Sequence, residues 1–171
     1  MFKLNKKGQA SSTFQLLIAA IVALAILGVL IAVIGNINPG SNDVKTTTNQ
    51  LLSQQINNPG ARQCTSPVRF QRNTTLAVEG ITNRTGLDSE QVFFNTEIDP
   101  INNFSNSDGK ILNYTGSSDR TVSLCIICSN DGKTGLEDIL GRYDDISNVD
   151  YPSDLPNTGD TVCIIYTKRA S

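Results

Sequence analysis

The chain has no histidine and no tryptophan, and its 171 residues include one methionine and four cysteines. Without histidine, the most frequent acid–base group of enzymes is missing. The sequence also has no glycine-rich phosphate loop and no Gly-x-Ser-x-Gly nucleophile elbow. Because no catalytic constellation assembles from the remaining residues, we expect neither enzymatic activity nor a cofactor.

Charge of either sign is scarce as well, with 14 lysines and arginines against 16 acidic residues and a net charge of -2. This balance provides no basic surface for nucleic acid, so we expect no nucleic-acid partner. The length suits a helix followed by one domain of roughly 110–130 residues, which is large enough for its own core.

The most distinctive stretch is an apolar run from Leu16 to Ile34 that has no charged or strongly polar side chain. As a helix it would be about 28 Å long, close to the ~30 Å hydrocarbon thickness of a bilayer. Lys3, Lys6 and Lys7 precede the run, and positive charge favours the cytoplasmic side. The polar part after the run is therefore expected outside. The apolar core of a cleaved secretory signal would be shorter, about 7–15 residues.

Residues 6–16, KKGQASSTFQL, resemble the class III signal peptides of archaeal type IV pilin-like proteins, in which a basic pair, Gly and Gln-x-Ser precede the apolar helix. In that family a prepilin peptidase cuts between the Gly and the Gln. The resemblance implies cleavage between Gly8 and Gln9, so that the apolar segment stays on the mature chain. Where the family often has Glu at the fifth mature position, this chain has Thr13, so a neighbouring subunit's N-terminal amine lacks its usual carboxylate partner. The likeness covers about the first 35 residues.

The resemblance implies a structural subunit of an archaeal adhesive type IV pilus, an extracellular surface filament. Its partners would be identical subunits in a helical homopolymer, the prepilin peptidase, the pilus assembly ATPase and membrane platform, and the membrane before assembly. Two alternatives stay open: a membrane-anchored extracellular binding protein that does not polymerise, and an archaellin-like motility filament subunit. The residues expected in the filament-core helix are Leu16, Leu17, Ile18, Ile21, Val22, Leu24, Ile26, Leu27, Leu30, Ile31 and Ile34.

These signals divide the chain into a leader (1–8), an N-terminal helix region (9–57) and a β-rich extracellular head (61–171). In the helix region the apolar part covers residues 14–35, and Pro39-Gly40 predicts a break near 39–40. A second helix is expected from Ser41 to about Ile56, because apolar residues there approximate one face. Asn57-Asn58-Pro59-Gly60 would end it.

In the head, short β-branched runs between Asn, Gly, Asp and Pro clusters predict strands. Asn106 to Gly109 favours a hairpin turn, and residues 135–141 a short helix. The expected fold class is α+β: a long N-terminal hydrophobic α-helix followed by a mostly antiparallel β head, as a small sandwich or sheet. The expected strands are 75–78, 91–94, 120–127 and 161–167, with weaker signals at 68–71 and 110–114.

The four cysteines lie in the head, and two disulfides are the expected state outside the cell. Cys125-Ile126-Ile127-Cys128 also suggests a thiol oxidoreductase, but it lies in a predicted strand instead of at a helix N-terminus. Zinc binding by four cysteines stays open as a minor alternative, although only one Cys-x-x-Cys pair exists. The disulfide candidates are Cys64, Cys125, Cys128 and Cys163.

Two further groups of polar residues are candidates for sites. Asp144-Asp145 and Asp150 with Asp154 are paired carboxylates in turn-rich sequence, where acids ordinarily cap turns or face solvent, and no metal site is predicted from them. Four Asn-x-Ser/Thr sequons suit a glycan-coated outer surface. Their asparagines, the N-glycosylation candidates, are Asn73, Asn83, Asn103 and Asn113.

Overall fold

The computed structural model describes residue 15, residues 17–27 and residues 44–170 with the exception of 84 and 148. The chain divides into two units, Met1–Pro39 and Gly40–Ser171. The second unit contains the head that the sequence predicts to be rich in strands. The expected break near 39–40 lies outside the described residues.

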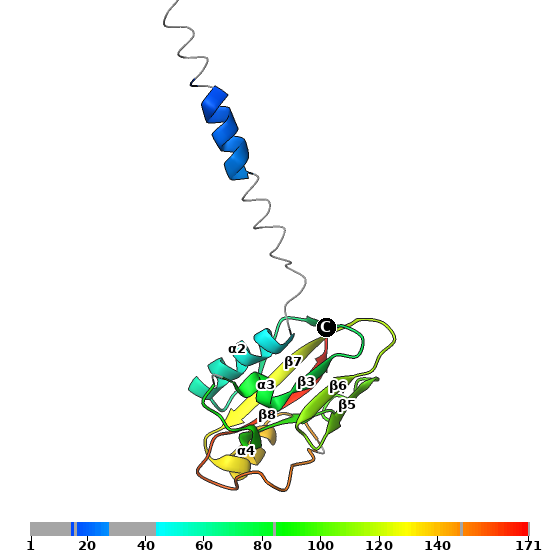
Figure 1. Ribbon diagram of the computed structural model, residues 1–171. Coiled ribbons are helices and arrows are strands. Elements are labelled where there is room, and N and C mark those ends of the chain that lie inside the picture. The colour runs from blue at the N-terminus through cyan, green and yellow to red at the C-terminus, as the bar shows by residue number, and fades with distance from the viewer. Residues whose placement is uncertain (1–14, 16, 28–43, 84, 148, 171) are drawn as a thin grey trace, which may run out of the picture. The chain divides into compact units, whose positions relative to one another are not determined.

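In the first unit, residues 17–27 form a short helix, drawn in blue in Figure 1. Its large apolar side chains are exposed, from 46% for Ile18 to 68% for Leu24. Within the described ranges, no helix has the length and apolar character needed to cross a bilayer. The prediction of a long apolar N-terminal helix is therefore wrong. Hydropathy indicated a helix surrounded by lipid or other helices, and a single chain offers these side chains no packing partner to stabilise such a helix.

A mixed five-stranded sheet forms the centre of the head. Its longest strands, β7 (Arg120–Ser129) and β8 (Val162–Arg169), are antiparallel neighbours. Two short strands, β1 (Gln63–Cys64) and β2 (Val68–Phe70), pair antiparallel with β7, and β4 (Val92–Asn95) pairs parallel with β8. The pairing of β4 with β8 is the parallel exception in a sheet that the sequence predicts to be mostly antiparallel.

Both faces of this sheet are covered, which explains why its central strands are continuous apolar runs. One core cluster contains Leu124 and Ile126 of β7 together with residues of α2 (Val44–Asn57) and α3 (Val78–Thr82). The other contains Ile127 of β7 and residues of α4 (Gly132–Leu140). Figure 1 shows α2 and α4 on opposite sides of the strands. The sequence predicts a small sandwich or a sheet, and the structure has a sheet with helices on both faces.

A second, three-stranded antiparallel sheet has the order β3 (Thr75–Ala77), β6 (Ile111–Tyr114), β5 (Phe104–Ser107). Leu76, Leu112 and Tyr114 face the same core as α2. The turn between β5 and β6 has positive φ at both Asp108 (51°) and Gly109 (68°), as the central residues of a type I′ turn require. The Lys110 N–H donates to the Ser107 carbonyl at 2.9 Å, and Ser107 pairs with Ile111 across the hairpin. The hairpin predicted from Asn106 to Gly109 is therefore confirmed.

Most predicted elements of the head have a counterpart in the structure. The second helix is confirmed as α2, the short helix as α4, and the six expected strands as β2, β3, β4, β6, β7 and β8. Local sequence did not predict β1, β5, α3 or the 3-10 turn η1 (Ser89–Gln91). These elements are two to five residues long, and such short segments form because neighbouring elements pair with them.

Candidate functional site

Two disulfides join the four cysteines, as the sequence predicts. Cys64 of β1 is bonded to Cys125 of β7, and Cys128 of β7 is bonded to Cys163 of β8. In each bond the cysteines are direct cross-strand partners, with Cα atoms 4.0 and 4.1 Å apart. This is the close spacing of facing residues in an antiparallel pair. Strand β7 is therefore covalently tied to a neighbouring strand on each side.

Cys125 and Cys128 form the Cys-x-x-Cys sequence but are not bonded to each other. Their odd spacing puts them on opposite faces of the strand: Cys125 packs in the cluster with α4, and Cys128 in the cluster with α2. A thiol oxidoreductase centre needs two cysteines that can bond to each other, so the hypothesis of a redox pair here is wrong. All four sulfurs are in disulfides, so none is available as a zinc-binding thiolate.

The two disulfides differ in their access to solvent. Cys64 is exposed, whereas Cys125, Cys128 and Cys163 are all 0% exposed. Thiol–disulfide exchange requires a thiolate to reach one of the sulfurs. The bond between β1 and β7 is therefore the one that external thiols can attack.

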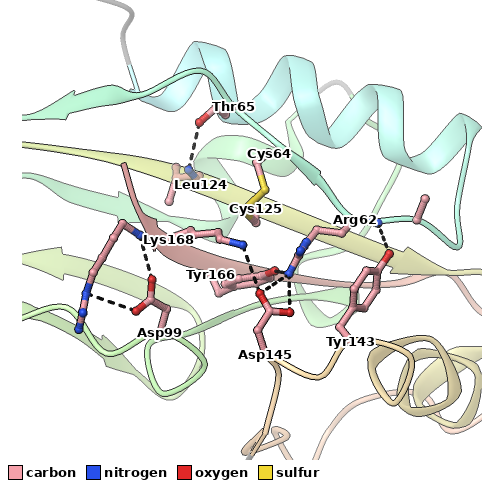
Figure 2. Close-up of a disulfide and its surroundings, with 12 residues drawn as sticks. Arg62, Cys64, Thr65, Asp99, Leu124, Cys125, Tyr143, Asp145, Tyr166 and Lys168 are labelled. Carbon is pink, nitrogen blue, oxygen red and sulfur yellow. Dashed lines mark hydrogen bonds and ion pairs between the residues drawn. A yellow bond between two sulfur atoms is a disulfide. The ribbon is translucent and has the colours of Figure 1, made fainter. Parts of the chain in front are cut away.

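A polar cluster surrounds the exposed disulfide (Figure 2). The Arg62 guanidinium donates to both carboxylate oxygens of Asp145, at 2.8 and 2.7 Å, and Lys168 of β8 contacts the same carboxylate at 3.2 Å. The Arg62 backbone N–H donates to the Tyr143 hydroxyl at 2.8 Å, and the guanidinium lies 4.7 Å from the centroid of that ring. The Tyr166 hydroxyl accepts a longer bond from Arg62, 3.4 Å. The cluster thus joins the start of β1 to the segment after α4 and to β8.

The charges of this cluster stabilise one another. The hydrogen bond from Arg62 lowers the pKa of Asp145. Burial lowers the pKa of Arg62, but hydrogen bonds to Tyr166 and Asp145 outweigh it, so that the pKa is raised. Burial raises the pKa of Tyr166. Since the Asp145 side chain is 50% exposed, each ion pair contributes at most about 1 kcal/mol. The arrangement holds segments together and presents no nucleophile with an adjacent base.

The two pairs of carboxylates noted in the sequence, Asp144-Asp145 and Asp150 with Asp154, do not form one site. Asp145 belongs to the cluster around Arg62, while Asp150 and Asp154 line an open hollow of about 770 Å³ beside the β5–β6 turn. Lys110 approaches Asp154 at 3.9 Å. Among the described residues, no group of three or more acidic or cysteine side chains is placed to hold a metal ion.

The four sequon asparagines lie in different settings. Asn73 and Asn103 are exposed in turns and have positive φ, 56° and 72°. Asn83 is exposed at the end of α3. Asn113 is half-buried in β6, the middle strand of the small sheet. Three of the four sequons therefore meet on one sheet.

The N-terminal site predictions are described only in part. Gly8 and Gln9 lie outside the described residues, and so do Leu16, Leu30, Ile31 and Ile34. The remaining core-helix candidates are all exposed on the short helix: Leu17, Ile18, Ile21, Val22, Leu24, Ile26 and Leu27.

No protein-family model matches this chain, and no curated protein or solved structure is significantly similar to it.

Proposed function

We propose that this chain is a structural subunit of an archaeal adhesive type IV pilus, which polymerises through its apolar N-terminal segment. The proposal rests on the order of three features along the N-terminal sequence: the basic pair Lys6-Lys7, then Gly8-Gln9, then the apolar run from Leu16. In this proposal a prepilin peptidase removes residues 1–8. The cytoplasmic membrane holds the chain until the assembly ATPase and membrane platform move it into the filament.

The exposed apolar side chains of residues 17–27 support a role in assembly. Seven large apolar side chains there are between 46% and 68% exposed. Moving them from lipid to water would cost about 0.3–0.6 kcal/mol each, or ~2–4 kcal/mol in total. Contacts with the same segment of neighbouring copies would offset this cost, and small residues such as Ala19, Ala20 and Ala23 would allow close approach.

The head supports an extracellular position. Disulfides persist in oxidising compartments and are rare in the cytosol of most cells, and this head has two of them. Both disulfides and the buried sheet give a compact head that does not depend on the N-terminal unit for its core. A pilin built in this way would expose the head on the filament surface.

The test is to purify surface filaments from cells that make this chain, image them by electron microscopy and determine the N-terminus of their protein by mass spectrometry. We expect the mature chain to start at Gln9 or its pyroglutamate form. A chain that starts at Met1 or after Asn36 would remove the basis for the pilin assignment. Correct processing in cells that form no filaments containing this chain would instead support the non-polymerising membrane-anchored protein.

A further inference from the structure

Three sequons meet on the three-stranded sheet in a way that the sequence does not reveal. Asn73 precedes β3 and Asn103 precedes β5, the two edge strands, while Asn113 lies in the middle strand β6. Thr75 and Ser105 are the hydroxyl residues of the first two sequons, and both are direct cross-strand partners of Asn113. The Thr75 hydroxyl donates to the Asn113 side-chain oxygen at 3.0 Å.

This row of residues lies on the outward face of the small sheet. Leu112 and Tyr114, the neighbours of Asn113 in β6, are buried in the core at 1% and 2% exposure. Because side chains alternate along a strand, Asn113 points to the opposite side. Its partners Thr75 and Ser105 are exposed. Residues from all three sequons therefore occupy one face of the head.

The three asparagines differ in how easily an enzyme could reach them. The Asn73 and Asn103 side chains are exposed. The Asn103 backbone carbonyl accepts from the Thr115 N–H at 2.9 Å and from the Thr115 hydroxyl at 3.4 Å. Both asparagines lie in turns, and only later residues of each sequon, Thr75 and Phe104-Ser105, are paired with β6, at the start of an edge strand. Freeing either sequon would therefore open one end of one ladder. Asn113 is paired through β6 on both sides. Freeing its sequon would break two strand ladders, which requires opening the whole small sheet.

We propose that this outward face is the glycosylated surface of the folded head, with N-linked glycans on Asn73 and Asn103 and none on Asn113. The donor is an oligosaccharide linked to a polyprenyl phosphate. The asparagine Nδ2 forms a bond to C1 of the sugar, and the bond from C1 to the phosphate oxygen breaks. Nδ2 loses one proton to a base of the transferase, and the lipid phosphate leaves. The inference rests on the extracellular position of the head in the proposed function.

The experiment uses the full chain produced in archaeal cells that N-glycosylate their surface proteins. Intact mass and glycopeptide mass spectrometry would compare the wild type with Asn73→Gln, Asn103→Gln and Asn113→Gln. Asn102→Gln is the matched control, because Asn102 is exposed beside Asn103 but begins no sequon. We expect the Asn73 and Asn103 variants each to lose one glycan mass, and the Asn113 and Asn102 variants to lose none.

Two further variants separate glycan attachment from changes to the asparagine itself. Thr75→Ala and Ser105→Ala keep Asn73 and Asn103 but destroy their sequons, and each should remove one glycan. A glycan on Asn113 in the wild type would overturn the proposal, because it would place modification before the sheet forms. Unmodified Asn73 and Asn103 would also overturn it.

Protease treatment of intact cells tests the location separately. If the head is cleaved from the surface but bare at Asn73 and Asn103, the glycan assignment fails while the extracellular position stands. If the head is protected on intact cells and cleaved only after lysis, the proposed function fails together with this inference.

Discussion

The disulfide between Cys64 and Cys125 should contribute about 4 kcal/mol to the stability of the head. It closes a loop with a sequence separation of 61 residues. In the chain-entropy treatment, a cross-link of that span removes ~4 kcal/mol of conformational entropy from the unfolded state at 25 °C. The double variant Cys64→Ala/Cys125→Ala should therefore lower the free energy of unfolding by about this amount, measured by urea denaturation of a chain beginning at Ser41.

The disulfide between Cys128 and Cys163 provides the comparison. Its sequence separation of 35 residues gives a similar entropic contribution, again about 4 kcal/mol. Both of its cysteines are 0% exposed, so replacing them by alanine also leaves space in the core. The variant Cys128→Ala/Cys163→Ala should accordingly lose more stability than Cys64→Ala/Cys125→Ala.

The disulfide between Cys64 and Cys125, whose loss should cost less stability, should nevertheless be the first to be reduced. At low concentrations of dithiothreitol, alkylation should label Cys64 and Cys125 before Cys128 and Cys163, because Cys64 alone of the four is exposed. Peptide mass spectrometry would follow the two pairs over time. Simultaneous labelling of both pairs, or earlier labelling of the buried pair, would refute the reasoning from exposure.

Three other outcomes follow from named contacts. Because Arg62 lowers the pKa of Asp145, the ion pair stabilises the folded state above the ordinary carboxyl pKa and is lost as the pH falls through the lowered value. Asp145→Asn should therefore reduce stability by less than about 1 kcal/mol near neutral pH, and its urea midpoint should equal that of the wild type in strong acid. Burial and the nearby Glu137 carboxylate raise the pKa of Tyr151 to about 12, so the stability from keeping it neutral is complete below the ordinary phenol pKa and declines as the pH rises toward 12. Burial also raises the pKa of Tyr166, so ultraviolet titration should show more than one late-ionising tyrosine, and one of them should disappear in Tyr151→Phe. Ala23→Asp should leave the head folded but abolish filaments in electron micrographs, because a carboxylate among apolar segments lacks a partner. Ala23→Ser, which keeps the side chain small and uncharged, should retain them. Normal filaments from the Asp variant would refute assembly through this segment.

Local sequence predicted the head's longer elements because their side chains carry the signal themselves. The strands β7 and β8 are β-branched runs, and Asp108-Gly109 is a turn sequence whose positive φ values the hairpin needs. The parallel pairing of β4 with β8 could not be predicted from the sequence, since no local pattern determines which strands become neighbours. For residues 17–27 the hydropathy predicted a helix surrounded by lipid or by other helices. In the single chain the large apolar side chains of this segment are exposed.

The cluster at the exposed disulfide was predictable only in fragments. The cysteines indicated disulfides, but their pairing follows from strand register. In the sequence Asp145 stands out only as an acidic neighbour of Asp144, whereas its partner Arg62 is 83 positions away. No spacing rule connects residues that meet only through the tertiary fold. The same holds for the sequons, whose convergence on one sheet comes from the pairing of β3, β6 and β5.

The two cross-links on β7 also determine how the head would bear tension. Starting from the end of α2, the chain reaches Cys64, crosses to Cys125, follows β7 for three positions to Cys128 and crosses to Cys163 in β8. This path is covalent throughout. A pulling force applied between α2 and the C-terminal strand would run along it, and the residues between each bonded pair, 65–124 and 129–162, would carry no load even if their hydrogen bonds opened. The head can therefore lengthen under force only at its two ends, which would suit the surface position proposed above.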